Sequence, residues 1–127
     1  MFVSAHQLLL KARAIISEIP LGQADGLLAD PTVLWLDVGE PAEYQQGHIA
    51  AALNIPRGML EFVISSDPQL QHTQRRIVVY CKTGGRAALA AQTLQQMGFV
   101  AVYALAGGYD AWQASGRPLS SPQLSFE

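Results

Sequence analysis

With 127 residues, half of them apolar and 14% charged, the chain has the size and composition of one folded domain and not of a disordered segment. Its formal net charge of −2 leaves no basic excess, which argues against nucleic-acid binding. No run approaches the roughly 18 apolar residues of a membrane helix. Lys11 and Arg13 interrupt the N-terminal apolar pattern, which does not suit a secretory signal. We therefore expect a cytoplasmic protein that binds neither nucleic acid nor membrane.

Helical and extended patterns alternate along the chain. Ser4 can cap a first helix, and Pro41 and Gly47 suit the start and end of another. The stretch 33–38 is almost continuously apolar, as expected of a strand buried on both faces. The expected helices cover 1–16, 23–29, 42–46, 59–64, 87–97 and 109–115, and the expected strands cover 17–19, 33–38, 52–55, 77–80 and 100–105.

This alternation predicts an α/β fold with a mostly parallel central sheet and helices on both faces. The chain shows no internal repeat and no linker, so we expect an N-terminal helix (1–16), a single α/β domain (17–118) and a loose Pro/Ser-rich tail (119–127). Reactive groups collect at the carboxyl ends of strands in such sheets. Asp37 and Cys81 both occupy this kind of position.

Cys81 is the only cysteine, and it lies between the strand 77–80 and an alanine-rich helix. Backbone N–H groups converge at a helix start and the helix dipole is positive there, which favours the reactive thiolate. A single cysteine excludes an internal disulfide and a CxxC redox or metal pair. Any covalent state of Cys81 must therefore be discharged by an external acceptor.

The residues after Cys81 form a loop with the composition of an anion cradle. Lys82 and Arg86 supply positive charge, Thr83 adds a hydroxyl donor, and Gly84 and Gly85 allow successive N–H groups to point inward. A buried packing cysteine would need neither the glycines nor the arginine. The loop therefore predicts binding of an oxyanion or of a charged sulfur species on Cys81.

Several segments, in order and with plausible spacing from about Ile19 to Pro118, resemble the signatures of the rhodanese family. The resembling segments are Leu36–Tyr44, Gly47–Ile49 and Ala52–Pro56 for its amino-terminal signature, Cys81–Arg86 for its active-site loop, and Gly98–Phe99, Leu105–Gly108 and Ala111–Trp112 for its carboxyl-terminal pattern.

The resemblance implies a single rhodanese-like domain that moves sulfane sulfur. Cys81 would take sulfur from a small-molecule donor such as thiosulfate, form a persulfide and pass the outer sulfur to cyanide, a thiol or a sulfur-carrier protein. The N–H groups of Lys82, Thr83, Gly84, Gly85 and Arg86 would stabilise the persulfide, and the two cations would attract an anionic donor. The resemblance implies no metal and no organic cofactor.

Two other functions remain open. Related phosphatases and arsenate reductases place one more residue between cysteine and arginine, whereas four residues separate Cys81 from Arg86 here, which favours sulfur over phosphate. A sulfur-delivery or sensing module, acting through a protein partner with little turnover alone, fits the same loop. The chain departs from the family at Gly39, where arginine is common, and at Ala87, where serine is frequent, which bears on rate and substrate preference.

For the other polar residues we expect supporting or structural roles. Asp37 is expected to help order the loop, and Glu43 to serve in helix capping or a salt bridge. His48 should make a structural hydrogen bond, because no second metal ligand lies at a recognisable spacing. Arg57 and Glu61 are expected to border the pocket.

Overall fold

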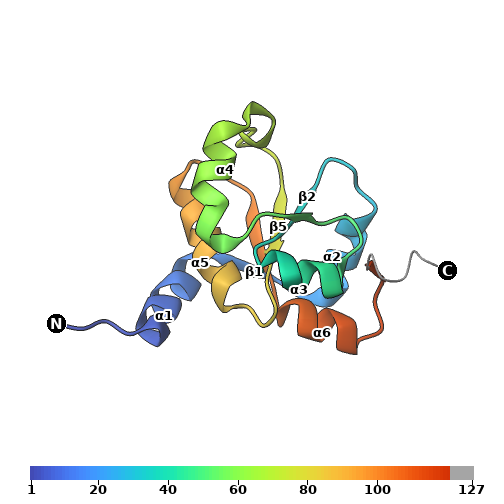
Figure 1. Ribbon diagram of the computed structural model, residues 1–127, viewed down its shortest axis with the longest axis horizontal. Coiled ribbons are helices and arrows are strands. Elements are labelled where there is room, and N and C mark those ends of the chain that lie inside the picture. Colours follow the sequence, from blue (N-terminus) through green and yellow to red (C-terminus); the bar gives the residue numbers. More distant parts are fainter. Residues whose placement is uncertain (121–127) are drawn as a thin grey trace.

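The computed structural model describes residues 1–120, which form one parallel five-stranded sheet flanked by helices (Figure 1). The strand order is β1-β6-β5-β2-β4, and every neighbouring pair in this sheet is parallel. Its strands are β1 (Ser17–Ile19), β2 (Leu34–Asp37), β4 (Leu53–Asn54), β5 (Ile77–Tyr80) and β6 (Val102–Leu105), and a separate antiparallel pair joins β3 (His48–Ile49) to β7 (Leu119–Ser120). The predicted α/β fold is confirmed.

The helices occupy most of the predicted stretches. They are α1 (Ala5–Ile15), α2 (Leu21–Leu28), α3 (Pro41–Gln46), α4 (Leu60–Ser66), α5 (Gly85–Gln96) and α6 (Gly108–Ala114), and two 3-10 turns span Arg57–Met59 and Pro68–Leu70. Ser4 caps α1 as expected, because its side chain accepts the Gln7 N–H and the Gln7 side chain accepts the Ser4 N–H. No helix within residues 1–120 is long and apolar enough to cross a bilayer.

Both faces of the sheet are buried. On β5, Ile77 and Val79 face one apolar cluster, while Val78 and Tyr80 face the other, as the alternation of side chains along a strand requires. The first cluster contains buried residues of α4 and α5, and the second contains those of α2 and α6. These two pairs of helices lie on opposite sides of the sheet (Figure 1). Because helices cover both faces of the sheet, side chains at the ends of the strands are the ones that remain accessible.

Small side chains allow α5 to lie close against the first face. Ala87, Ala90 and Ala91 are fully buried there. The helix α1 packs in turn on α5, where Gln95 Nε2 donates to the Ile15 carbonyl at 3.3 Å. On the opposite face, the buried side chains of Trp35 and Trp112 meet edge to face with ring centroids 5.5 Å apart.

Two expectations are corrected. The helix α5 begins at Gly85 and not at residue 87, because Gly84 (φ 134°) makes the turn and frees the following residues to be helical. Leu119 and Ser120, expected in a loose tail, pair with Ile49 and His48 and belong to the folded domain. Two-residue strands carry no periodic signal, so the sequence did not reveal this pairing. The rest of the predicted tail, 121–127, lies outside the described residues.

Candidate active site at the carboxyl edge of the sheet

Three strands bring the site together. In β2, β4 and β5 the last residues are Asp37, Asn54 and Tyr80, and Asp37 is paired in register with both of the others. Cys81 follows Tyr80 directly, so its side chain lies at the same edge as Asp37. The parallel register therefore joins the two positions that the sequence placed at strand ends.

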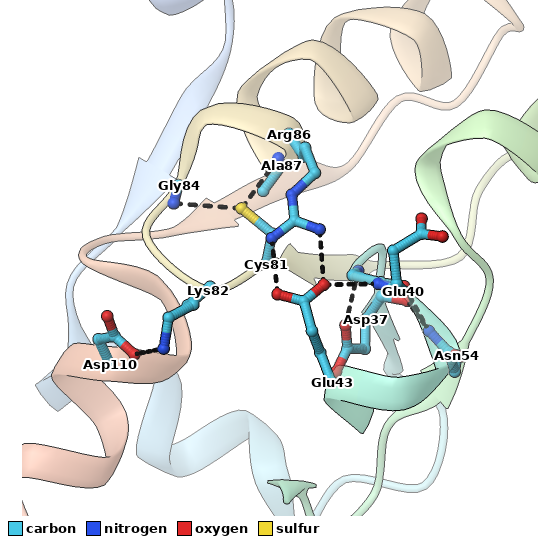
Figure 2. A network of polar contacts seen from close by, with 11 residues as sticks. Asp37, Glu40, Glu43, Asn54, Cys81, Lys82, Gly84, Arg86, Ala87 and Asp110 are labelled. Carbon is cyan, nitrogen blue, oxygen red and sulfur yellow. Dashed lines mark hydrogen bonds and ion pairs between the residues drawn. The ribbon is translucent and has the colours of Figure 1, made fainter. Parts of the chain in front are cut away.

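The loop after Cys81 folds back over the sulfur. The backbone N–H groups of Gly84 and Ala87 donate to Cys81 Sγ at 3.1 and 3.4 Å (Figure 2). Cys81 itself is only 2% exposed. Ala87 stands in the first turn of α5, so its N–H belongs to the positive end of that helix. These two donors and the helix end favour negative charge on the sulfur.

The start of α6 holds the other side of the loop. The N–H groups of Tyr109 and Asp110 donate to the carbonyls of Cys81 and Lys82 at 2.8 and 3.0 Å. A Cβ on Gly108 (φ 62°) would lie 2.7 Å from both of those carbonyl oxygens. Glycine is therefore required at 108 for α6 to anchor the loop carbonyls on the side away from the sulfur.

Each loop cation is paired with a carboxylate (Figure 2). Lys82 Nζ lies 3.1 Å from Asp110 Oδ1. Arg86 binds Glu43 with both terminal nitrogens, at 2.7 and 3.1 Å, in the two-pronged geometry that guanidinium and carboxylate favour. The Arg86 guanidinium and the Glu40 N–H lower the pKa of Glu43 to about 2, and Glu43 in turn raises the pKa of Arg86. The positive charge of the loop is thus largely compensated.

Asp37 is a buried carboxylate in the wall of the site. It is 5% exposed, and its Oδ1 accepts the Gly39 N–H at 2.8 Å. Burial raises the pKa of Asp37, while the hydrogen bonds from Gly39 and from the Tyr80 hydroxyl act in the opposite direction. Burial likewise raises the pKa of Tyr80, whose hydroxyl oxygen accepts the Ile49 N–H at 3.0 Å. A backbone N–H thus holds the carboxylate, and no lysine or arginine within residues 1–120 forms an ion pair with it.

These groups surround a pocket of about 340 Å³ beside Cys81. The residues that line it are Asp37, Gly39, Glu43, Gln46, Gly47, Tyr80, Cys81, Lys82, Tyr109 and Gln113. The helices α3 and α6 contribute the two exposed glutamines and Tyr109, which no local motif identified, because only packing brings those helices to the edge of β5. Tyr80 could have been suspected from its place next to Cys81 at the strand end.

The remaining predicted site residues lie as follows. Gly84 and Gly85 occupy the turn and the first position of α5, and Thr83 is exposed, with no hydrogen bond from its hydroxyl to the sulfur. Ala87, expected to matter only through a missing hydroxyl, contributes its N–H. Arg57 is bonded to Glu61 and to Thr93 Oγ1, and neither Arg57 nor Glu61 lines the pocket, contrary to expectation.

His48 has the structural role that the sequence predicts. Its Nδ1 lies 2.8 Å from the Tyr44 carbonyl oxygen, and its ring stacks on that of Tyr44 with centroids 3.6 Å apart. Within residues 1–120, no cluster of three or more histidine, cysteine or acidic side chains is arranged to hold a metal ion.

Two side chains of α1, those of Leu9 and Arg13, lie near the glycines of the loop. A Cβ on Gly85 would lie 3.6 Å from Leu9 Cδ1, and one on Gly84 would lie 3.7 Å from an Arg13 guanidinium nitrogen. No carboxylate in the described part of the chain forms an ion pair with Arg13. Arg13 does not line the pocket beside Cys81.

Comparison with known proteins places this arrangement in a family. A sulfurtransferase from Allochromatium vinosum is 34% identical over 110 residues, covering 86% of this chain and 99% of that protein. Two solved structures are also similar. A Rhodopseudomonas palustris protein of unknown function, named as a possible tyrosine phosphatase, has a TM-score of 0.84 and 32% identity over 94% of this chain and 96% of its own. The polysulfide-sulfur transferase homodimer of Wolinella succinogenes has a TM-score of 0.74 and 28% identity over 94% and 89% of the two chains.

The family model of the rhodanese-like domain matches residues 21–115, which run from the start of α2 to the end of α6 and include every residue that lines the pocket. Together with the cysteine loop at the end of β5, this match shows that the chain belongs to the rhodanese-like domain family.

Proposed function

We propose that this domain is a sulfurtransferase that carries sulfane sulfur as a persulfide on Cys81. The observation that carries the proposal is the environment of one atom. Cys81 directly follows a buried strand, its Sγ accepts two backbone N–H groups, and the residue lines a pocket. Such donors stabilise a thiolate and also the negatively charged persulfide formed from it. The sulfurtransferase from Allochromatium vinosum among the relatives supports the same chemistry.

The reaction takes place in two displacements. The Cys81 thiolate attacks the outer sulfur of the donor, and the sulfur–sulfur bond of the donor breaks. The rest of the donor molecule leaves with the electron pair of that bond. For thiosulfate the leaving group is sulfite. A thiolate or cyanide then attacks the outer sulfur of the persulfide, and Cys81 leaves as the thiolate. No net oxidation occurs in the cycle, and the chain needs no second cysteine to complete it.

The backbone donors remain in place through both displacements, since they belong to the loop and to the start of α5. Their geometry is fixed by the α6 contacts to the loop carbonyls. The protein therefore contributes a preorganised cradle for charge that stays on sulfur throughout the cycle.

The first experiment follows thiocyanate formation from saturating thiosulfate and cyanide. We expect Cys81→Ser to lower the turnover rate by at least about a thousandfold, because removal of a covalent nucleophile removes the pathway. A matched control restores the thiol elsewhere, with Ser17→Cys on the exposed edge strand β1 in the Cys81→Ser background. Turnover in that control, or in Cys81→Ser alone, would contradict the proposal.

The second experiment separates turnover from sulfur delivery. Intact mass spectrometry after exposure to thiosulfate or polysulfide should show the mass of one added sulfur atom in the wild type and none in Cys81→Ser. A persulfide that forms but is discharged slowly by cyanide and small thiols would instead assign the domain to delivery through a protein partner.

A phosphatase function is the remaining candidate, since the Rhodopseudomonas palustris relative is named as a possible tyrosine phosphatase. The four-residue interval between Cys81 and Arg86 and the pairing of Arg86 with Glu43 argue against it, because a phosphate dianion would have to displace a carboxylate from the guanidinium. We expect no Cys81-dependent release of phosphate from an aryl phosphate.

A further inference from the structure

Cys81 is reached from solvent through a pocket whose wall is acidic. The sulfur belongs to a residue that is 2% exposed, and the pocket beside it contains both Asp37 and Glu43. A sulfur donor or acceptor must enter this space to bring its reacting atom to Sγ. The charge of the wall therefore acts on any charged group that the incoming molecule carries near its sulfur.

The loop cations do not offset this wall. Lys82 is 3.1 Å from Asp110, and Arg86 is occupied by Glu43. The charged residues that line the pocket are Asp37, Glu43 and Lys82, and the partners of Glu43 and Lys82 are Arg86 and Asp110, which lie outside the lining. Each ion pair is neutral as a unit, so the charge left uncompensated at the pocket is that of Asp37. Arg86 donates to Glu43 with both terminal nitrogens, so an anionic group could reach that edge of the guanidinium only by displacing the carboxylate.

Asp37 differs from Glu43 and Asp110 in that its carboxylate has no lysine or arginine partner within residues 1–120. Its Oδ1 accepts the Gly39 N–H at 2.8 Å. Gly39 leaves the carboxylates uncovered on the pocket side. A Cβ there would lie 3.0 Å from Asp37 Oδ1 and 3.1 Å from Glu43 Oε1, so a side chain at 39 would press on both.

We propose that this pocket selects the acceptor of the persulfide sulfur by charge, and that the preferred acceptor is a small aminothiol, in which an ammonium group lies close to the thiol. The inference rests on the proposed sulfur transfer and specifies its acceptor. The aminothiolate attacks the outer sulfur of the Cys81 persulfide, the bond between the two sulfurs breaks, and Cys81 leaves as the thiolate while the aminothiol carries the persulfide. Its ammonium faces Asp37 and Glu43 during the transfer. A thiol with a carboxylate in the same place would face like charge.

The test compares two acceptors of similar size and opposite charge, cysteamine and 3-mercaptopropionate. The protein is loaded with sulfur, freed of excess donor and mixed with each thiol, and the loss of one sulfur atom from the intact mass is followed in time. Rate constants are expressed per thiolate, and the quantity compared between variants is the ratio of the cysteamine to the mercaptopropionate rate constant. This ratio cancels the intrinsic reactivities of the two thiols when variants are compared.

We expect Asp37→Asn to lower this ratio about tenfold, because one negative charge at short range acts in opposite directions on the two acceptors. Asparagine keeps the oxygen that accepts the Gly39 N–H, so the local structure is retained. Gln46→Lys, on an exposed position of α3 that lines the pocket, should lower the ratio in the same direction and does not touch the core. The matched control is Asp30→Asn. Asp30 precedes β2, at the amino ends of the strands and away from the pocket, so this substitution should leave the ratio unchanged.

Two outcomes would overturn the inference. The ratio could be the same in the wild type, Asp37→Asn and Gln46→Lys, which would show that the wall does not act on the acceptor. Alternatively, Arg13→Gln could raise the ratio severalfold, which would show that anionic acceptors approach over Gly84 and not through the pocket. Failure of Cys81 to load with sulfur is a separate result, which would contradict the proposed function itself.

Discussion

Glu43 connects the two halves of the site. It lies on α3, and its carboxylate accepts the Glu40 N–H at the start of that helix. The same carboxylate accepts hydrogen bonds from both terminal nitrogens of Arg86 in α5. One side chain thereby caps α3, fixes α3 against the cysteine loop and neutralises the loop arginine. The sequence predicts a capping or salt-bridge role for Glu43, but the partner is 43 positions away and is set by packing.

The low pKa of Glu43 leads to a prediction about acid stability. A folded-state pKa of about 2 against 4.5 means that its contribution is complete above pH 4.5 and is lost as the pH falls from 4.5 towards 2. The formal contribution of about 3 kcal/mol is reduced to about 1 kcal/mol by solvent screening, since the two side chains are 36% and 39% exposed. Denaturant unfolding at several pH values should show that Glu43→Gln loses about this much at pH 6 and differs little from the wild type near pH 2.

A matched variant checks that the effect belongs to Glu43. Glu61→Gln on α4 removes an equal charge from a partly exposed pair with Arg57, which precedes that helix, and should cost only a few tenths of a kcal/mol. Asp37 contributes with the opposite sign, because its pKa is raised by burial, so the comparison of variants is more informative than the slope of the wild type alone. An unfolding free energy of Glu43→Gln that parallels the wild type at every pH would contradict the assignment.

At the scale of elements, the cysteine loop is held between two helix starts. The start of α5 directs an N–H to the sulfur, and the start of α6 directs N–H groups to the loop carbonyls. The orientation of the peptide groups in the loop follows from both. The four residues between β5 and α5 would not keep this conformation alone, because the hydrogen bonds to the Cys81 and Lys82 carbonyls come from a helix more than 20 positions further along the chain.

Gly108 tests this arrangement. We expect Gly108→Ala to lower the free energy of unfolding by at least about 2 kcal/mol, because its Cβ would contact two carbonyl oxygens at 2.7 Å and the backbone has a positive φ. The same change should lower sulfur transfer, since the displaced carbonyls belong to Cys81 and Lys82. Chemical denaturation and the thiocyanate assay measure the two effects.

The control for this prediction is another glycine. Gly26 lies within α2, and a Cβ there meets nothing within 4 Å. We expect Gly26→Ala to raise the free energy of unfolding by roughly 0.5–1 kcal/mol, the usual gain of alanine over glycine inside a helix. Equal stability of the two alanine variants would show that the α6 contact does not constrain the loop.

At the scale of the molecule, one sheet separates two apolar clusters that share the same strands. Val79 faces the cluster of α4 and α5, whereas its neighbours Val78 and Tyr80 face the cluster that contains both tryptophans. A strand cannot leave one cluster without leaving the other. We therefore expect the domain to unfold in one cooperative transition.

Tryptophan fluorescence allows a test, because Trp35 and Trp112 both lie on the face opposite to Val79. The Val79→Ala substitution, at a fully buried site, should lower the free energy of unfolding by about 2 kcal/mol. The fluorescence and circular dichroism midpoints should shift together. Val100→Ala, at a position 66% exposed, should shift neither. Separate midpoints for the two probes would show that the faces unfold independently.

The sequence by itself determined the alternation of elements, the buried strand 77–80 and the place of Cys81 at its end. These features depend on local patterns: apolar runs, glycine and proline at element ends, and a cysteine followed by glycines and cations. The alternation of elements predicted the α/β fold, and the resemblance to the rhodanese family rested on motif segments in order along the chain. Both are confirmed.

Only the tertiary structure decided the charge of the site. The sequence shows Lys82 and Arg86 beside the cysteine and predicts a cationic cradle, yet packing gives each of them a carboxylate from a distant helix. Packing also places the Asp37 carboxylate in the wall of the pocket, where no lysine or arginine of residues 1–120 pairs with it. Charge compensation depends on which side chains meet, and that is fixed by the docking of α3 and α6 against the edge of the sheet. The nucleophile is therefore a local property of this chain, whereas the selectivity that we infer for it is a property of the fold.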